Sequence, residues 1–368
     1  MNSNTRFLPL SEWGFNFSHP LIIAGPCSVE TPEQVQQTAI ALKQRGAQML
    51  RGGIWKPRTR PGTFQGIGRE GLQWLRDAGI ASGLYTCVEV ASPRHVEDAL
   101  TAKIDVIWLG ARTTVNPFLV QEIADALAGV NIPVLIKNPI NPELELWLGA
   151  IERIERAGIK RIAAVHRGFS TFEKTIYRNP PNWEIPIELR RRFNELPLLC
   201  DPSHICGKRD MIASVCQTAL DLSFDGLMIE SHINPPQAWS DNEQQLTPEE
   251  LGKLLAGLVL RNITVDDVVF NSLLEKLRHR IDQVDADILN LMAERMHVAR
   301  EIGQYKKEHN MTIFQLKRWE EILRTRTQLG VEQELTPEFV AKMYELIHSE
   351  SIYHQTQVMN KSDVGSEL

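Results

Sequence analysis

Residues 20 to about 260 repeat one pattern, in which a short apolar run typical of a strand is followed by a turn and an amphipathic helix. The predicted strands are Leu21–Ser28, Gln48–Ile54, Leu84–Val90, Val106–Arg112, Pro133–Pro139, Ile162–Gly168, Pro197–Ile205 and Gly226–His232. Helical patterns lie between them, as at Pro32–Gly46, Ser92–Ala102, Asn116–Gly129 and Glu143–Gly158. Eight such cycles predict a closed (β/α)₈ barrel, the TIM-barrel architecture of the α/β class.

The main alternative is a doubly wound open sheet. A G-x-G-x-x-G sequence after the first strand would favour that fold, but Ala24-Gly25-Pro26-Cys27-Ser28 stands there instead. The last helix of the repeat, Thr247–Leu258, opens with Thr247, Pro248 and Glu250, which predicts a capping box.

The strand pattern stops near residue 261. We therefore predict a barrel domain at 1–261, a linker at 262–271 and an all-helical domain at 272–368. Its first helix is long, because apolar residues recur at alternating spacings of four and three: Leu277, Ile281, Val284, Ile288, Leu291, Val298, Ile302 and Tyr305. Two shorter helices, about Leu316–Leu329 and Pro337–Met359, complete a three-helix domain.

The composition is that of an ordinary globular protein, with 43% apolar and 23% charged residues and a net charge of −6. It excludes a disordered chain and argues against a nucleic-acid-binding protein. There is no apolar run of about 18 residues, so we expect no membrane-spanning helix. Five scattered cysteines and a polar N-terminus favour a cytoplasmic protein.

Cations gather where the predicted strands end, which is where a (β/α)₈ barrel carries its chemistry. They are Arg51, Lys56, Arg58, Arg112, Lys137 and Arg167. One such residue is usually a solvated surface charge. Six at one rim, in a chain of negative net charge, predict a polyanionic ligand with phosphate and carboxylate groups.

A second set at the same rim offers a thiolate, an imidazole and two carboxylates: Cys27, His204, Glu230 and Asp241. Taken singly, Cys27 and His204 are typical core residues. Together they predict a site for one divalent metal ion per barrel, and the mixed donors do not distinguish Mn²⁺, Fe²⁺, Co²⁺ and Zn²⁺.

Several motifs resemble those of the 3-deoxy-D-arabino-heptulosonate 7-phosphate (DAHP) synthase family. They are Ala24–Ser28, Lys56-Pro57-Arg58-Thr59, Gly110-Ala111-Arg112, Asp201-Pro202-Ser203-His204 and Met228-Ile229-Glu230. The resemblance implies metal-dependent condensation of phosphoenolpyruvate with erythrose 4-phosphate, the first step of the shikimate pathway. It implies that Arg112, Lys137 and Arg167 bind the phosphoenolpyruvate phosphate, and that Arg51 and Lys137 bind its carboxylate.

By the same resemblance, Arg58 and Thr59 bind the phosphate of erythrose 4-phosphate, and Lys56 reaches its reactive end. Lys56, Lys137 and His204 are then the catalytic candidates of the barrel. The alternative is a related synthase that uses arabinose 5-phosphate, which the Lys56–Thr59 motif disfavours. Arg60, Gly62 and His166 depart from the family pattern.

In the helical domain, one position of the apolar stripe is occupied by Arg295. A cation on a packing surface is costly unless an anion meets it, and the simplest alternative is a pair with Glu294 or Glu301. Lys306 returns to nearly the same helix face about 16 Å further on, so both cations could bind one small dianion. Arg278 lies about 25 Å before Arg295, so it could serve only the site of an antiparallel partner chain. We therefore expect a homodimer, or a larger assembly, through this domain.

Residues 273–357 resemble the all-helical chorismate mutase family, which converts chorismate to prephenate. The matching motifs are Leu277-Arg278, Ala293-Glu294-Arg295, Gly303-Gln304-Tyr305-Lys306, Ser351 and Gln355. The resemblance implies that Arg295, Lys306 and Gln355 are catalytic. It implies that Arg318, Ser351 and, from the partner chain, Arg278 bind substrate.

Trp319 and Gln315 replace acidic residues that are common in this family. The alternative is therefore a non-catalytic module for dimerisation or for sensing prephenate. Because the barrel has no added regulatory domain, we also consider that the helical domain inhibits the barrel when it binds prephenate or chorismate. The sequence thus predicts a transferase joined to an isomerase.

Overall fold

The computed structural model of the chain describes residues 6–56, 62, 64–262 and 264–361. It divides into two compact units, Met1–Ile263 and Thr264–Leu368. Each unit is described by itself below.

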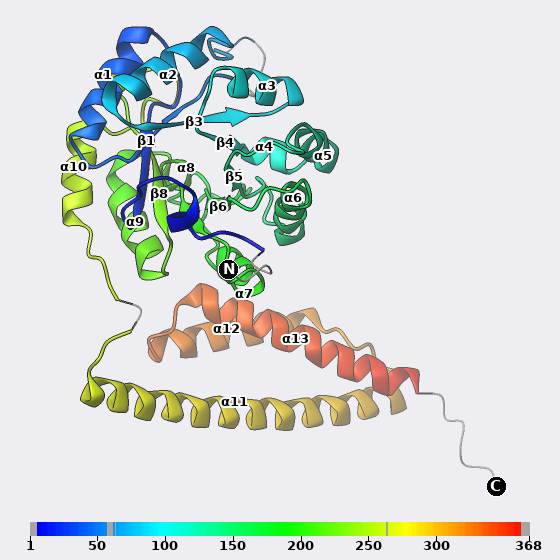
Figure 1. The fold of residues 1–368 in the computed structure, drawn as a ribbon. Helices are drawn as coiled ribbons and strands as arrows, with labels where there is room; N and C mark the ends of the chain where they lie inside the picture. The colour runs from blue at the N-terminus through cyan, green and yellow to red at the C-terminus, as the bar shows by residue number, and fades with distance from the viewer. Residues whose placement is uncertain (1–5, 57–61, 63, 263, 362–368) are drawn as a thin grey trace. The chain divides into compact units, whose positions relative to one another are not determined.

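The first unit is a closed barrel of eight parallel strands, paired in sequence order (Figure 1). The strands are β1 Leu21–Gly25, β2 Met49–Gly52, β3 Tyr85–Val90, β4 Val106–Leu109, β5 Val134–Lys137, β6 Ile162–His166, β7 Leu198–Cys200 and β8 Gly226–Glu230. The last strand closes on the first, with Ile23 opposite Met228 and Gly25 opposite Glu230. The predicted barrel is confirmed. Every strand is shorter than predicted, although β1, β4, β6 and β8 begin at the predicted residue.

The strands read as continuous apolar runs because both of their faces are buried. One set of side chains fills the barrel interior, including Ile23, Met49, Trp108, Leu135 and Met228. The alternating set packs outward against the helices.

Helices surround the sheet in the predicted alternation. They are α1 Pro32–Lys43, α2 Glu70–Ser82, α3 Pro93–Thr101, α5 Pro117–Ala126, α6 Leu144–Arg156, α7 Glu184–Arg192, α9 Ile212–Asp221 and α10 Pro248–Gly257, with the short α4 Ala111–Thr114 and α8 Pro202–Cys206. The capping box predicted at Thr247 and Glu250 is present in α10. Two candidate site residues expected at strand ends, Arg112 and His204, lie instead on α4 and α8.

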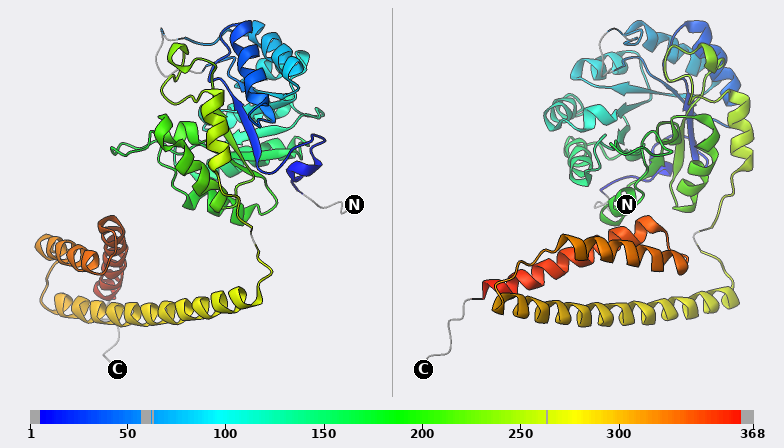
Figure 2. Two further views of the ribbon diagram at one scale, coloured as in Figure 1. Left: turned by 90° about the vertical axis from the view of Figure 1, so that its left-hand side faces the viewer. Right: turned by 180° about the vertical axis from the view of Figure 1, so that it is seen from behind.

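The second unit consists of α11 Val268–Glu308, α12 Leu316–Glu332 and α13 Pro337–Asn360, and α13 packs against both other helices (Figure 2). The long helix begins inside the segment predicted as a linker, because Asp267 caps it by accepting hydrogen bonds from Val269 and Phe270. No described helix is long and apolar enough to cross a membrane.

The apolar stripe of α11 is exposed along its length. Leu277 is 50% exposed, Ile281 59% and Leu291 65%. The buried residues of α11 are instead Met296, Ala299 and Gly303. The predicted packing surface therefore has no partner within the described part of this unit.

Candidate active sites

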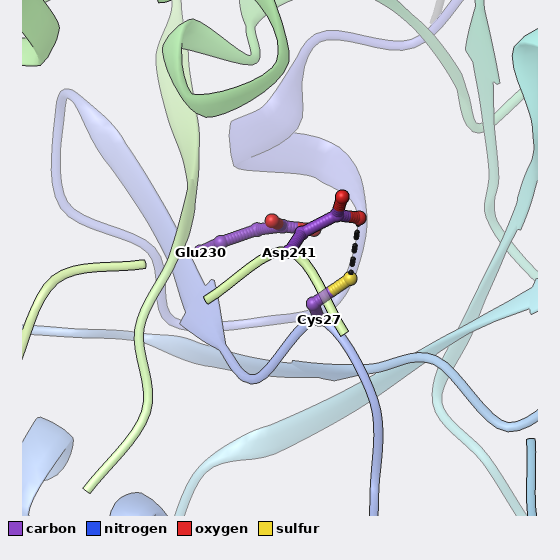
Figure 3. A group of neighbouring side chains, drawn as sticks. All are labelled: Cys27, Glu230 and Asp241. Carbon is purple, nitrogen blue, oxygen red and sulfur yellow. Dashed lines mark hydrogen bonds between the residues drawn. The ribbon is translucent and has the colours of Figure 1, made fainter. Parts of the chain in front are cut away.

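Three of the four predicted metal ligands come together at the carboxyl ends of the strands (Figure 3). Cys27 follows β1 by two residues, Glu230 is the last residue of β8, and Asp241 lies in the loop after β8. One ligand atom from each lies within 4.8 Å of the others, and Cys27 Sγ is 3.1 Å from Asp241 Oδ2.

The fourth predicted ligand, His204, lies beside this group and outside it. Its Nε2 is 3.7 Å from Glu230 Oε1, and its Nδ1 is 2.8 Å from Asp201 Oδ2. Asp201 also caps α8 by accepting a hydrogen bond from the His204 backbone. A carboxylate on one ring nitrogen orients the other toward a metal, as in many metal sites.

The donor set fits a divalent ion. Donor atoms bound to one such ion at about 2.0–2.3 Å lie roughly 3–4 Å apart, close to the spacing found here. Glu230 Oε1 is buried and, within the described part of the chain, has ionic contacts but no hydrogen bond. A thiolate with two carboxylates suits a transition-metal ion better than Mg²⁺ or Ca²⁺.

The surroundings shift the pKa of the thiol and of the two carboxyl groups in opposite directions. Burial, and then the nearby Glu230 carboxylate, raise the pKa of the Cys27 thiol to about 12. Burial opposes ionisation of Glu230 and Asp241, but the surrounding cations outweigh it and lower the pKa of both carboxyl groups. In addition, Lys56 Nζ lies 2.9 Å from Cys27 Sγ.

Two predicted cations are buried beside the ligand group. Lys137 Nζ is 2.6 Å from Asp201 Oδ2, and Arg51 Nη2 is 3.1 Å from Glu230 Oε1. Both also lie over the ring of Trp108, at 5.7 and 5.1 Å from its centroid. Among the described residues, Arg51 Nε and Nη1 have no hydrogen-bond partner, so they could receive an anion.

A second group of cations flanks the first. Burial, together with the charges of Arg178 and Arg112, lowers the pKa of Arg167 to about 10 against the opposing effect of Asp201. The three guanidinium groups therefore influence one another, as expected where a phosphate binds. Arg178 was not among the predicted residues. The predicted Arg58 and Thr59 lie outside the described residues.

In the helical unit, a pocket of about 390 Å³ contains most of the predicted mutase residues. Its lining includes Arg295, Lys306, Gln315, Arg318, Trp319, His348, Ser351 and Gln355. Arg295 Nη1 donates to Ser351 Oγ at 2.5 Å, and within the described part of the chain Arg295 forms no ion pair with Glu294 or Glu301. Gln355 Oε1 is buried and has no hydrogen-bond partner among the described residues.

Two further features of the pocket bear on the sequence prediction. Trp319 stacks on His348 with ring centroids 4.1 Å apart, and His348 was not predicted to be near the site. Arg278 is absent from the described lining and pairs with Glu275 at 2.7 Å on the exposed surface of α11. Within one chain, the structure thus brings together all the predicted mutase residues except Arg278.

The sequence profile of the DAHP synthetase I family matches residues 17–260. The profile named chorismate mutase type II matches residues 277–356. The phospho-2-dehydro-3-deoxyheptonate aldolase of Thermotoga maritima is 37% identical, over 64% of this chain and 67% of that protein. The 2-dehydro-3-deoxyphosphooctonate aldolase of Vesicomyosocius okutanii is 23% identical, over 68% of this chain and 94% of that protein.

Solved structures agree with the sequence relatives. The crystal structure of the Thermotoga maritima DAHP synthase aligns with a TM-score of 0.58 and 35% identity, over 64% of this chain and 67% of that one. A truncated form of the same enzyme aligns with a TM-score of 0.56 and 33% identity, over 64% and 84%. The chain belongs to the DAHP synthetase I family, and a chorismate mutase type II domain follows its barrel in the sequence.

Proposed function

We propose that the barrel condenses phosphoenolpyruvate with erythrose 4-phosphate to give DAHP and inorganic phosphate. The observation that carries this proposal is a rim where buried cations adjoin a possible metal site. The arabinose 5-phosphate alternative is not favoured, since the relative named as an octonate aldolase is the more distant one.

In this reaction, C3 of phosphoenolpyruvate forms a bond to the aldehyde carbon of the sugar. Water adds to C2, and the C–O bond to phosphate breaks. Arg112, Lys137 and Arg167 bind the departing phosphate, and Arg51 with Lys137 binds the carboxylate. Lys56, close to Cys27, faces the aldehyde end, and Arg58 with Thr59 binds the sugar phosphate. Positioning and charge stabilisation provide most of the rate.

The proposed metal site uses Cys27, Glu230 and Asp241, with His204 completing it. When bound, the ion supplies Lewis-acid polarisation of the aldehyde oxygen. Asp201 orients His204 and balances the charge of Lys137, since it lies within 3 Å of both side chains.

We further propose that the helical domain rearranges chorismate to prephenate. This reaction needs no acid, base or nucleophile, only a pocket that holds two carboxylates and stabilises charge on the ether oxygen. Arg295 and, from the partner chain, Arg278 provide cations for the carboxylates, and Lys306 and Gln355 face the ether oxygen. Arg318 is a further substrate-binding residue. An ether oxygen only accepts hydrogen bonds, so Gln355 would donate to it from Nε2, which in this structure makes only a long contact of 3.4 Å to the carbonyl of Ser351 among the described residues.

We also propose a homodimer formed through α11 in a cytoplasmic protein. The exposed apolar stripe of this helix, from Leu277 to Leu291, is the surface a second copy would cover. Monomeric proteins rarely expose so long an apolar surface. In this arrangement Arg278 enters the partner's pocket. We keep the predicted domain boundaries, with the synthase domain at 1–261 and the mutase domain at 272–368.

One experiment tests both activities on the full chain. Phosphoenolpyruvate consumption is measured with erythrose 4-phosphate and with arabinose 5-phosphate, before and after a chelator, and chorismate loss is measured in parallel. We expect turnover with erythrose 4-phosphate only, its loss after chelation, its return with Mn²⁺, and chelator-insensitive chorismate turnover. Absence of chorismate turnover would favour a sensing module, and inhibition of the synthase by prephenate would then identify its ligand.

A further inference from the structure

Two consecutive glutamines, Gln244 and Gln245, follow Asp241 in the loop after β8. They are 1% and 0% exposed. A buried amide is costly unless its donor and acceptor are both paired. Both amides are paired. Their partners belong to a proposed metal ligand, to the residue that precedes one in the sequence, or to an arginine that contacts one.

Gln245 connects the two loops that carry Cys27 and Asp241. Its Oε1 accepts a hydrogen bond from the Cys27 backbone N–H at 2.9 Å. Its Nε2 donates to the carbonyl of Ser240 at 2.8 Å. One side chain thus fixes the backbone at Cys27 relative to the residue immediately before Asp241.

Gln244 makes the corresponding connection between the two carboxylates. Its Nε2 donates to Glu230 Oε2 at 2.6 Å. Its Oε1 accepts from Arg178 Nη1 at 2.7 Å, and the same Nη1 lies 3.0 Å from Asp241 Oδ1. The amide therefore restrains one oxygen of Glu230 while Glu230 Oε1 stays without a hydrogen bond among the described residues.

A primary amide satisfies these contacts, and an ionised carboxylate does not. A backbone N–H and a guanidinium only donate, whereas a carbonyl and a carboxylate only accept. Each glutamine must therefore present one donor and one acceptor from the same head group. A carboxylate of equal size would place a lone pair against Ser240 O or against Glu230.

The loop needs such restraint. Asp241 has a φ of 45°, in the left-handed region that a non-glycine residue adopts only when its surroundings hold it there. After Gln245 the chain returns to β8, where Leu246 N donates to Glu230 O at 3.0 Å. The two glutamines thus lie in the sequence between Asp241, whose backbone is strained, and Leu246, whose backbone is hydrogen-bonded to the end of β8.

We propose that Gln244 and Gln245 are positioning residues that hold Cys27, Glu230 and Asp241 at the spacing that a divalent ion requires. This inference rests on the proposed metal site and assigns the residues that build it. It predicts that removing either amide weakens metal binding without removing a ligand.

The test compares Gln245→Glu, Gln244→Glu, Gln245→Met and Gln244→Met with the wild-type full chain. Gln73→Glu, on the exposed surface of α2, is the control. Mn²⁺ affinity of the metal-free proteins is measured by calorimetry, and Co²⁺ binding by the thiolate-to-cobalt absorption band. We expect Mn²⁺ dissociation constants about 10- to 100-fold above wild type, as for other residues that orient metal ligands.

The absorption band distinguishes positioning from a general structural role. It should weaken more in Gln245→Glu than in Gln244→Glu, because Gln245 contacts the Cys27 loop. A dissociation constant within twofold of wild type in all four variants would overturn the proposal. So would loss of the folded barrel in all four, because the pair would then be a structural requirement. Wild-type protein that binds Mn²⁺ but does not condense the two substrates would overturn the proposed synthase activity alone.

Discussion

At the scale of single residues, the buried charges of the barrel rim form a chain of contacts. Asp201 lies 2.6 Å from Lys137, 2.8 Å from His204 and 4.0 Å from Arg51. Burying any one of these charges alone would cost several kcal/mol, so each depends on the others. Among the described residues, Arg51 Nε and Nη1 have no hydrogen-bond partner, although Nη1 makes the 4.0 Å contact with Asp201, so both nitrogens can still donate to a substrate anion.

Lys137→Met should lower kcat/KM of the synthase by about 10²- to 10³-fold, as when one charge-stabilising donor is removed from other active sites. The reason is loss of a proposed contact to both the phosphate and the carboxylate of phosphoenolpyruvate. Steady-state kinetics measure this decrease in kcat/KM, and Lys253→Met, at an exposed position, is the control. Chorismate turnover in the same preparation should be unchanged. Equal losses in both activities would indicate misfolding instead.

His166 gives a prediction about stability and pH. Its ring lies among Phe169, Trp183 and Phe224, and burial lowers its pKa to about 3, below the value of about 6.5 of an unfolded chain. Between these values the unfolded chain binds the proton and the folded one does not. This residue therefore reduces stability as the pH falls below about 6.5, by about 3 kcal/mol at pH 4.5.

Urea unfolding of wild type and His166→Leu at pH 7 and pH 4.5 measures this effect. The variant should lose less stability than wild type over that range, because it cannot take up the proton. A difference between the two proteins that does not change with pH would contradict the prediction.

The clustering of possible metal ligands at the rim could be predicted from the sequence, but the residues that support them could not. Cys27, Glu230 and Asp241 were found because their side-chain types bind metals. Asp201 stood in a recognised motif without a role, and its contact with Lys137 joins residues 64 apart. In the sequence, Gln244 and Gln245 resemble ordinary loop residues. Only the folded structure shows which groups their amides contact.

At the scale of elements, periodicity predicted each strand and its order but not where each strand ends. The apolar runs continue past the sheet because the residues after it are also buried. Pro202 begins α8 and Gly110 precedes α4, so the chain turns into short helices there. These turns, rather than strand ends, place His204 and Arg112. Similarly, the heptad pattern of α11 predicted a long helix but not which face α13 would cover.

Gly303 of α11 lies directly against Gln355 of α13, one of the residues that line the pocket. A Cβ at this position would lie 3.0 Å from the Cα of Gln355. Gly303→Ala should therefore push Gln355 away, destabilise the unit by about 1–3 kcal/mol and lower chorismate turnover at least tenfold. Thermal unfolding and mutase kinetics measure both effects.

The matched control is Gly149→Ala on α6, where an added Cβ would meet only the flexible end of Arg153. Replacing that helical glycine should leave stability unchanged or raise it by up to about 1 kcal/mol. If Gly303→Ala keeps full mutase activity, the close approach of the helices is not what positions Gln355.

At the scale of the whole molecule, the two units differ in how complete each is within one chain. The barrel buries its own core, and its rim contains the three clustered metal-ligand candidates. The helical unit leaves the stripe of α11 exposed and keeps Arg278 outside the described lining of its own pocket. The proposed mutase activity therefore depends on assembly, whereas the proposed synthase chemistry draws on residues of one barrel.

Complementation between inactive variants tests this dependence. Arg278→Ala and Arg295→Ala should each abolish most chorismate turnover while leaving the synthase active. In a dimer of one variant with the other, one pocket combines an intact Arg295 with the partner's intact Arg278, and the other pocket lacks both. Random pairing of the co-expressed chains should then restore about a quarter of wild-type mutase activity. Both arginines must act in the same chain if the mixture stays as inactive as its parents while co-purification of differently tagged chains shows that the mixed dimer forms.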